Sequence, residues 1–323
     1  MVENFGNASE QITAKSVHDV LLSLIKSNAV LLINVASLHA ERIFNYDYVR
    51  NNINEQFMPY IAALAVLGFL GADIGKSAIE RIVNSMGIPT NNEILENLSE
   101  LEKHENYLIY ANAIHFIMST GMEPTMDRIL EVSKALGIEP NSDHASAVLL
   151  LYRNPPHSSL TFIDPSLRFR NGGKGYLLRM RAHELLRGTV SAMYQMVIRD
   201  FYMIYHDDRI LKLGNDAIPY VAAAVTLSYT ARNITKDGIA VLLQSVGIST
   251  RDDIQGAMTS VYHYNNVAYV LAVFAIALSG KEPNVEQINK TALTLGVVSD
   301  LQLAEFALLL YKSYKTGTNM LGV

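Results

Sequence analysis

The chain has 323 residues, of which 50% are hydrophobic and 18% are charged, and its formal net charge is −5. This composition provides a full hydrophobic core and excludes a disordered chain, and the acidic balance gives no overall basic signature of nucleic-acid binding. Cysteine is absent. That excludes disulfide bonds, thiolate chemistry and cysteine-ligated zinc, and is compatible with a reducing compartment.

The first fifteen residues are polar and are predicted to form an N-terminal arm. They lack the basic and apolar stretches of a signal peptide. After the arm, Ser16 and Asp19 have the spacing of a helix-capping box, which predicts a helix start there. Apolar runs such as 58–72 and 267–278 are shorter than the roughly 20 residues that a bilayer span needs. We therefore expect an intracellular, cytoplasmic protein without membrane contact.

One stretch of the sequence occurs twice in the chain. Residues 59–88 recur as 219–248, 160 positions later, with eleven identities and no gap, including Pro59/Pro219, Tyr60/Tyr220 and Gly87/Gly247. The match continues at an offset of 159, from His104/His263 to Tyr152/Tyr311. A repeat of this length predicts an internal duplication and hence two similar lobes.

Each lobe contains one small unit twice, at 59–88 and 109–138 and again at 219–248 and 268–297. The unit reads as an apolar helix opened by tyrosine, a polar connection, a second helix, and glycine followed by Ile or Val. Proline at the first helical turn and glycine just after the last are start and stop signals. Four glycines are predicted to be left-handed helix ends: Gly87, Gly137, Gly247 and Gly296. The fold class is therefore all-α, with paired helical hairpins in each lobe, and the opening tyrosines are expected in the core with a polar tip.

The segments predicted from these patterns follow the chain in order. They are the N-terminal arm at 1–15, helical lobe 1 at 16–153, a basic Pro/Gly linker at 154–176, helical lobe 2 at 177–313, and a C-terminal tail at 314–323.

Positive charge gathers at the linker. Seven basic residues stand against two acidic ones between Arg153 and Arg187, and aromatic residues are interleaved with them. Basic residues that alternate with aromatic ones can bind nucleic acid without sequence preference: the basic side chains contact the phosphate backbone and the aromatic rings stack on the nucleobases. The predicted nucleic-acid-binding residues are Arg168, Arg170, Lys174, Arg179, Arg181 and Arg187. The alternative is a solvated connector whose arginines pair with acidic lobe surfaces.

The hairpin unit resembles the N-terminal dimerisation domain of the acidic ribosomal stalk proteins of archaea and eukaryotes. The resemblance lies in 60–63 (YIAA) and 220–223 (YVAA), in the apolar positions of the second helix, and in the Ser-x-Gly-Ile endings at Ser85 and Ser245. It implies that two hairpins per lobe form, within one chain, the kind of interface that stalk proteins make between chains. The family's Ala-rich hinge and acidic tail are missing, so no functional residue is carried over.

The sequence contains few motifs that are typical of catalytic or cofactor-binding sites. HExxH, GxSxG, Walker and dinucleotide-binding motifs are absent. The glycine-rich residues 171–175 offer a weak phosphate loop or, alternatively, a flexible linker. His104 and His263 are interpreted as hydrogen-bonded helix-end residues, and His206 with its two following aspartates as a solvated turn, in preference to metal sites. We expect no enzyme, cofactor, metal or small-molecule substrate.

Two functions remain open from the sequence. The first is a non-catalytic helical structural or assembly protein, nucleoprotein-like, that self-associates and binds single-stranded nucleic acid through the basic segment. The second is a protein–protein adaptor or capsid-like scaffold that binds no nucleic acid.

Overall fold

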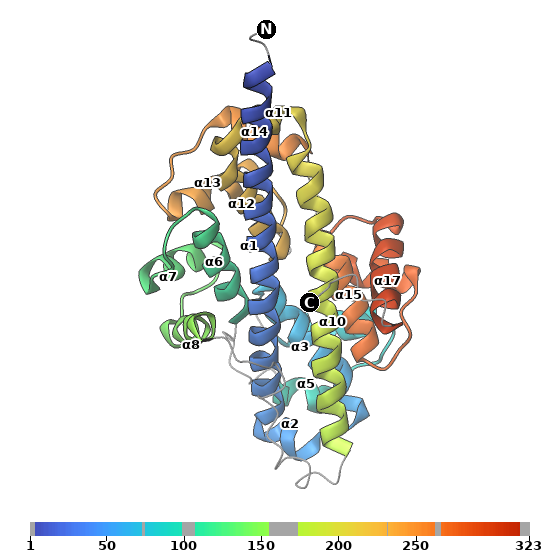
Figure 1. Cartoon of the computed structure of the whole chain (residues 1–323). Coiled ribbons are helices and arrows are strands. Elements are labelled where there is room, and N and C mark those ends of the chain that lie inside the picture. Colours follow the sequence, from blue (N-terminus) through green and yellow to red (C-terminus); the bar gives the residue numbers. More distant parts are fainter. Residues whose placement is uncertain are drawn as a thin grey trace.

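Two long helices run side by side and antiparallel through the middle of the computed structural model (Figure 1). They are α1 (Asn4–Asn45) and α10 (Lys174–Tyr205). Apolar residues of α1 such as Ile25, Leu32 and Ala36 are buried at the three-to-four-residue spacing that keeps one side of a helix in the core. The structure describes residues 4–72, 75–98, 107–154, 174–230, 232–261 and 266–316.

All regular structure in those ranges is helical, which confirms the all-α class. After α1 come α2 (Asp47–Asn52) and a 3₁₀ turn, η1 (Glu55–Phe57). After α10 come α11 (Asp208–Leu211) and η2 (Gly214–Ala217). None of the described helices is both long and apolar enough to cross a bilayer.

Four helical hairpins are packed around the central pair. Their first helices are apolar on every side and buried along almost their whole length, as expected for helices inside a core. Their second helices are amphipathic; in the first hairpin, for example, Ile79, Ile82 and Val83 are buried. The hairpins are α3 (Met58–Leu70) with α4 (Lys76–Ser85), α6 (Tyr107–Ser119) with α7 (Met126–Ala135), α12 (Ile218–Tyr229) with α13 (Lys236–Ser245), and α15 (Val267–Leu278) with α16 (Val285–Thr294).

One further helix follows each hairpin. These are α5 (Asn92–Leu98), α8 (Ser142–Arg153), α14 (Asp252–Val261) and α17 (Leu301–Lys315). The order of helices from α1 to α8 thus recurs from α10 to α17. This recurrence is the arrangement that a duplication requires, and the duplication itself stays a prediction.

The capping signals of the hairpins are confirmed. Pro59 and Pro219 lie in the first turns of α3 and α12, where a missing N–H costs no helical hydrogen bond. The four predicted glycines have positive φ angles of 69°, 78°, 77° and 88° along the chain. After the first three of them, the next residue's N–H closes the helix end, as when Ile248 donates to the Leu243 carbonyl at 2.9 Å.

The tyrosine at the start of each hairpin is buried and its hydroxyl reaches the chain just beyond that hairpin. The Tyr110 hydroxyl accepts from the Asn141 N–H at 2.7 Å, and the Tyr220 hydroxyl accepts from the Arg251 N–H at 2.8 Å. Tyr60 accepts likewise from Asn91, and Tyr269 donates to the Val298 carbonyl. Each tyrosine therefore joins its hairpin to the segment that leads into the next helix, as the expectation of a core residue with a polar tip requires.

The hairpins pair across the two halves of the chain. Helix α3 packs against α15 and α4 against α16, while α6 packs against α12 and α7 against α13. The Lys281 ammonium donates to the carbonyls of Met86 and Gly87 at 2.8 and 2.9 Å, so the second half caps the end of α4. The expectation that two hairpins of one lobe pair with each other is corrected by these contacts. Each hairpin has its main hairpin partner in the opposite half.

Two predicted boundaries also shift. Helix α1 begins at Asn4, so residues 4–15 belong to a helix and the start predicted at Ser16 is wrong. The helix continues because nothing in 4–15 breaks it: the stretch has no proline, and its one glycine is tolerated. At the linker, α10 begins at Lys174, three residues inside the range assigned to the connection.

Candidate functional site

The predicted basic surface is only partly within the described residues. Arg168, Arg170 and most of the glycine-rich residues 171–175 lie outside them, as do His104 and His263. Lys174 is the first residue of α10, and its side chain is also outside the described part. The three remaining predicted residues, Arg179, Arg181 and Arg187, are on α10.

Arg179 is a core residue, with only 1% of its surface exposed. Its guanidinium donates to the Phe44 carbonyl at 2.6 Å and to the Asn45 side chain at 3.2 Å, and it lies 3.4 Å from the Glu41 carboxylate. Burial lowers the pKa of Arg179, and the Glu41 carboxylate partly opposes this shift. Arg179 therefore fastens α10 to α1 and presents no cation to a polyanion.

The same carboxylate has a second buried partner. His183 lies one turn after Arg179 on α10, and its Nε2 is 2.8 Å from Glu41 Oε1. Glu41 is thus shared between an arginine and a histidine of the opposite long helix. Buried charges are tolerated only when they are paired and hydrogen-bonded, and this cluster meets that condition.

Arg181 and Arg187 point to other sides of α10. Arg181 is half-buried: one guanidinium nitrogen donates to the Ala277 carbonyl at 3.2 Å and the other lies 3.7 Å from Glu55. Arg187 is exposed. Since each helical residue turns by about 100°, Arg179 and Arg181 point in nearly opposite directions, and Arg187 points in a third. The three described arginines therefore do not form one basic face.

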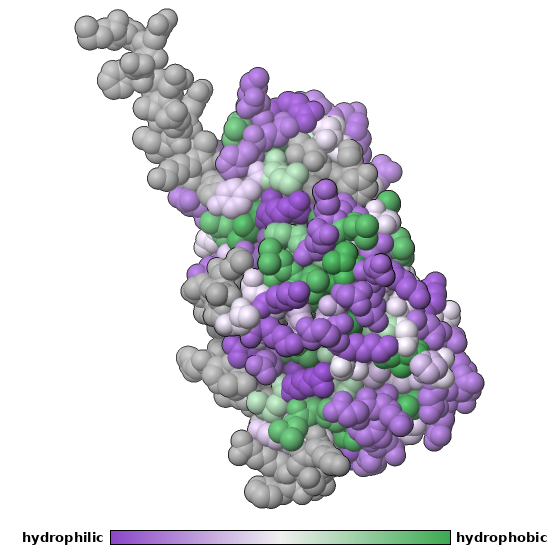
Figure 2. Space-filling view, turned by 90° about the vertical axis from the view of Figure 1, so that its right-hand side faces the viewer, coloured by the Kyte–Doolittle hydropathy of each residue, from purple (hydrophilic) through white to green (hydrophobic). Residues whose placement is uncertain are grey.

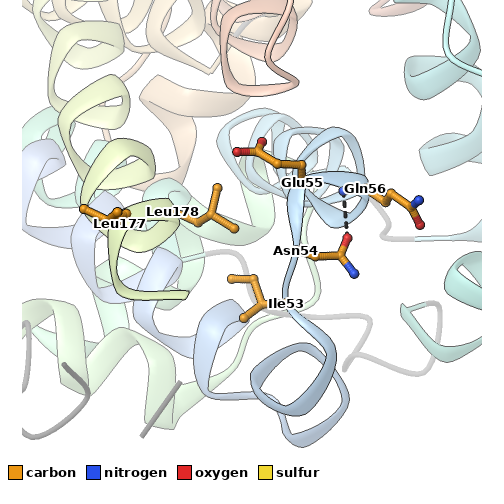
Figure 3. Close-up of a pocket in the computed structure, with 6 residues that line it drawn as sticks. All are labelled: Ile53, Asn54, Glu55, Gln56, Leu177 and Leu178. Atoms are coloured by element: carbon orange, nitrogen blue, oxygen red, sulfur yellow. Dashed lines mark hydrogen bonds between the residues drawn. The ribbon is translucent and has the colours of Figure 1, made fainter. Parts of the chain in front are cut away.

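A pocket lies where α10 begins, beside η1. It has a volume of about 600 Å³ and is lined by Ile53, Asn54, Glu55, Gln56, Leu177 and Leu178. Figure 3 shows Leu178 of α10 directed towards the segment 53–56, Leu177 on the other side of the helix turn, and the Glu55 carboxylate on the α10 side of that segment. This volume is within the range of ligand pockets, roughly 300–1,000 Å³. The pocket is our candidate functional site.

The wall formed by 53–56 is held by its own hydrogen bonds. The Asn54 side chain accepts from the Gln56 N–H at 2.8 Å, drawn in Figure 3, and donates to the Asn52 carbonyl at 3.2 Å. An asparagine that caps a short helix in this way fixes the entry of the chain. The shape of this wall is therefore set before any ligand binds.

Sequence reasoning missed this pocket. Its two walls are more than 120 positions apart in the sequence, and the only local signal is the capping residue Asn54, which by itself indicates a turn. Arg181, a predicted site residue, does contact the rim through Glu55.

The predicted solvated turn at His206 is confirmed. His206 is exposed, and Asp207 accepts from the N–H of Arg209 as the cap of α11. The paired Arg209 side chain lowers the pKa of Asp207 to about 2. Within the described part of the chain, no three His, Cys, Asp or Glu side chains are placed to hold a metal ion. Comparisons with protein-family models, with curated proteins and with solved structures find no match.

Proposed function

We propose that the chain is a helical structural protein that assembles with other protein chains through two surfaces, those of α8 and α17, which we call its flanks. The observation that carries this proposal is a related pair of exposed leucines. Leu150 of α8 and Leu309 of α17 are 63% and 55% exposed and stand at equivalent places, 159 positions apart. Helices α8 and α17 lie on opposite sides of the central pair (Figure 1).

The α17 flank carries further apolar surface. Val298, three residues before this helix, and Leu301, its first residue, are 67% and 54% exposed. The face that includes α17 shows apolar residues at the surface between hydrophilic ones (Figure 2). Single exposed apolar residues are ordinary, whereas several on one element mark a contact surface. Similar contact points on two opposite sides suit a subunit that binds a neighbour on each side.

Size-exclusion chromatography with light scattering tests this proposal. We expect the wild-type chain to form an oligomer whose mass falls with dilution, and the Leu150→Glu/Leu309→Glu variant to be monomeric and equally helical. Val241→Glu is the matched control, because Val241 is an exposed apolar residue, 45% exposed, on the hairpin helix α13. A monomeric wild type, or equal disruption by the control, contradicts the proposal.

Nucleic-acid binding is the second candidate, favoured by the excess of basic residues between Arg153 and Arg187. A quadruple alanine variant of Arg168, Arg170, Lys174 and Arg187 is then expected to lose affinity for single-stranded RNA and to show a shallower dependence of affinity on salt. The control replaces exposed bases elsewhere, at Arg81, Lys134, Lys212 and Lys290. Equal binding by the two variants, or a 260/280 nm absorbance ratio of pure protein for the wild type, argues against this candidate.

A further inference from the structure

The pocket beside η1 has an aliphatic wall that is open to solvent. Leu177 is 66% exposed, while Leu178, one residue further along α10, is buried. Ile53 lies on the other wall, on the side of Leu178 (Figure 3). A leucine exposed at the edge of a pocket gains about 25 cal/mol for each Å² of apolar surface that a bound group covers. The pocket therefore favours an aliphatic group.

The opposite rim presents polar groups with hydrogen-bonding capacity to spare. The Glu55 carboxylate is 70% exposed and lies 3.7 Å from Arg181, too far for a hydrogen bond. Arg181 pairs with this carboxylate only at that distance, because its other guanidinium nitrogen donates to the Ala277 carbonyl at 3.2 Å. Among the described residues no donor is hydrogen-bonded to the Glu55 carboxylate, and the Gln56 side chain has no hydrogen-bond partner either. A cationic donor reaching this rim would gain a charge-assisted hydrogen bond.

The openness of the pocket indicates the kind of ligand. A site for a small molecule typically encloses 70–90% of the ligand surface, whereas here the rim residues Leu177 and Glu55 remain mostly exposed. An open rim of this kind suits the side chains of another polypeptide better than an enclosed small molecule. The leucines favour an aliphatic side chain, and the Glu55 carboxylate favours a basic side chain next to it.

We propose that this pocket binds a short segment of a partner protein in which an aliphatic residue stands beside Lys or Arg. The aliphatic side chain packs between Leu177, Leu178 and Ile53, and the basic side chain donates to Glu55. This inference rests on the proposed role as a protein that associates with other chains, and it gives one partner its chemistry.

A peptide titration followed by amide NMR shifts tests the proposal. The probe is acetyl-Ala-Leu-Lys-Ala-amide, and acetyl-Ala-Leu-Glu-Ala-amide is the matched probe with the charge reversed. We expect saturable shifts at residues 53–56 and 177–178 with the lysine peptide, and at least fivefold weaker binding of the glutamate peptide. Equal binding of the two peptides, or shifts confined to other regions, overturns the proposal.

Two variants extend the test. Glu55→Gln should weaken the lysine peptide about fivefold, and Leu177→Asp should abolish its binding; both residues are exposed, so the fold should be preserved. Glu305→Gln, at an exposed carboxylate of α17, is the control and should bind like the wild type. If Glu55→Gln binds as tightly as the wild type, the assigned role of the carboxylate is wrong.

Light scattering on the same preparations separates this inference from the proposed function. Association that persists while no peptide shift is seen removes only the pocket proposal. If the chain is monomeric but still binds the lysine peptide, the proposed assembly through the flanks is wrong and the proposal for the pocket is retained.

Discussion

His39 of α1 shows how one buried residue makes stability depend on pH. It is almost fully buried beneath α3, where a Cβ on Gly68 would lie 2.5 Å from its Nε2. Burial lowers the pKa of His39 to about 4; the Leu64 backbone opposes this shift, and His144 adds to it. His39 therefore binds a proton more weakly in the folded protein than in the unfolded chain.

This difference in pKa predicts acid lability. The unfolded chain takes up the proton below about pH 6.5, so the stabilisation is complete above that pH and is lost as the pH falls towards 4, by roughly 3 kcal/mol in total. Urea unfolding at several pH values between 7.5 and 4 measures this loss. The non-titrating variant His39→Gln should show a flatter slope over the same interval, and an unchanged slope would assign the pH dependence to other groups.

The Glu41 cluster gives a second prediction for single residues. Glu41→Gln removes the negative charge beside Arg179, whose guanidinium is buried. Breaking one partner of a buried ion pair costs about 3–5 kcal/mol, whereas replacing both partners by apolar groups is often nearly neutral. We therefore expect Glu41→Gln to be strongly destabilised in urea, and Glu41→Leu/Arg179→Met to be more stable than Glu41→Gln. A double variant weaker than the single one would disprove this account.

The predictability of residues follows the reach of their interactions. The capping roles of Pro59 and Gly87 are local and were predicted from a few neighbouring residues. The role of Arg179 was not, because its partner Glu41 is 138 positions away and a basic residue near a Pro/Gly-rich segment looks the same in the sequence whether it is paired or free. For the same reason the pocket, whose walls come from 53–56 and 177–178, has no sequence signature.

At the level of helices, the contact of α10 with α17 depends on one glycine. Gly188 is inside α10, and a Cβ there would lie 2.4 Å from the Tyr314 ring. The Tyr314 hydroxyl donates to the Glu184 carbonyl at 2.9 Å, which holds the ring over the glycine. The glycine therefore allows the two helices to approach, at the cost of a poor helix former in a long helix.

Alanine at this position should be unfavourable. Alanine normally stabilises a helix interior by about 1 kcal/mol relative to glycine, but at position 188 its methyl group meets the ring of Tyr314. We expect Gly188→Ala to lower the melting temperature and Tyr314→Ala to relieve the effect of Gly188→Ala. Gly256→Ala is the control: this glycine of α14 has only ordinary contacts with Lys236, so alanine should be neutral or stabilising there. A stable Gly188→Ala protein would mean that α17 is not held as described.

Helix prediction worked where periodicity and stop signals agreed. All four hairpins were predicted, because an apolar run, a polar turn and a final Gly-Ile or Gly-Val pair each mark part of the same unit. The start of α1 was missed because its first turns are polar and were interpreted as an arm. Polarity alone does not end a helix when no proline interrupts it.

For the whole molecule, the pairing of hairpins across the halves could not be predicted from the sequence. The first helices of the hairpins have equivalent apolar surfaces, so a hairpin finds a similar partner in its own half or in the other one. The structure pairs α3 with α15 and α6 with α12, and it places α1 of the first half against α10 of the second. The two halves are therefore mutually dependent parts of one core, although each contains the full series of helices.

This dependence predicts how the chain behaves when it is divided. Fragments 1–163 and 164–323 divide the chain between the end of α8 at Arg153 and the start of α10 at Lys174. Each fragment expressed alone would expose the apolar surfaces of helices such as α3 or α15, which are buried almost completely in the whole chain. We expect each to be unfolded or insoluble, and the co-expressed pair, with an affinity tag on only one fragment, to copurify in equal amounts with the helical content of the intact protein. The intact chain cut by a protease at an engineered site after Ile163 serves as the control and should stay associated. A soluble single half with cooperative unfolding of its own would show that the halves are independent domains.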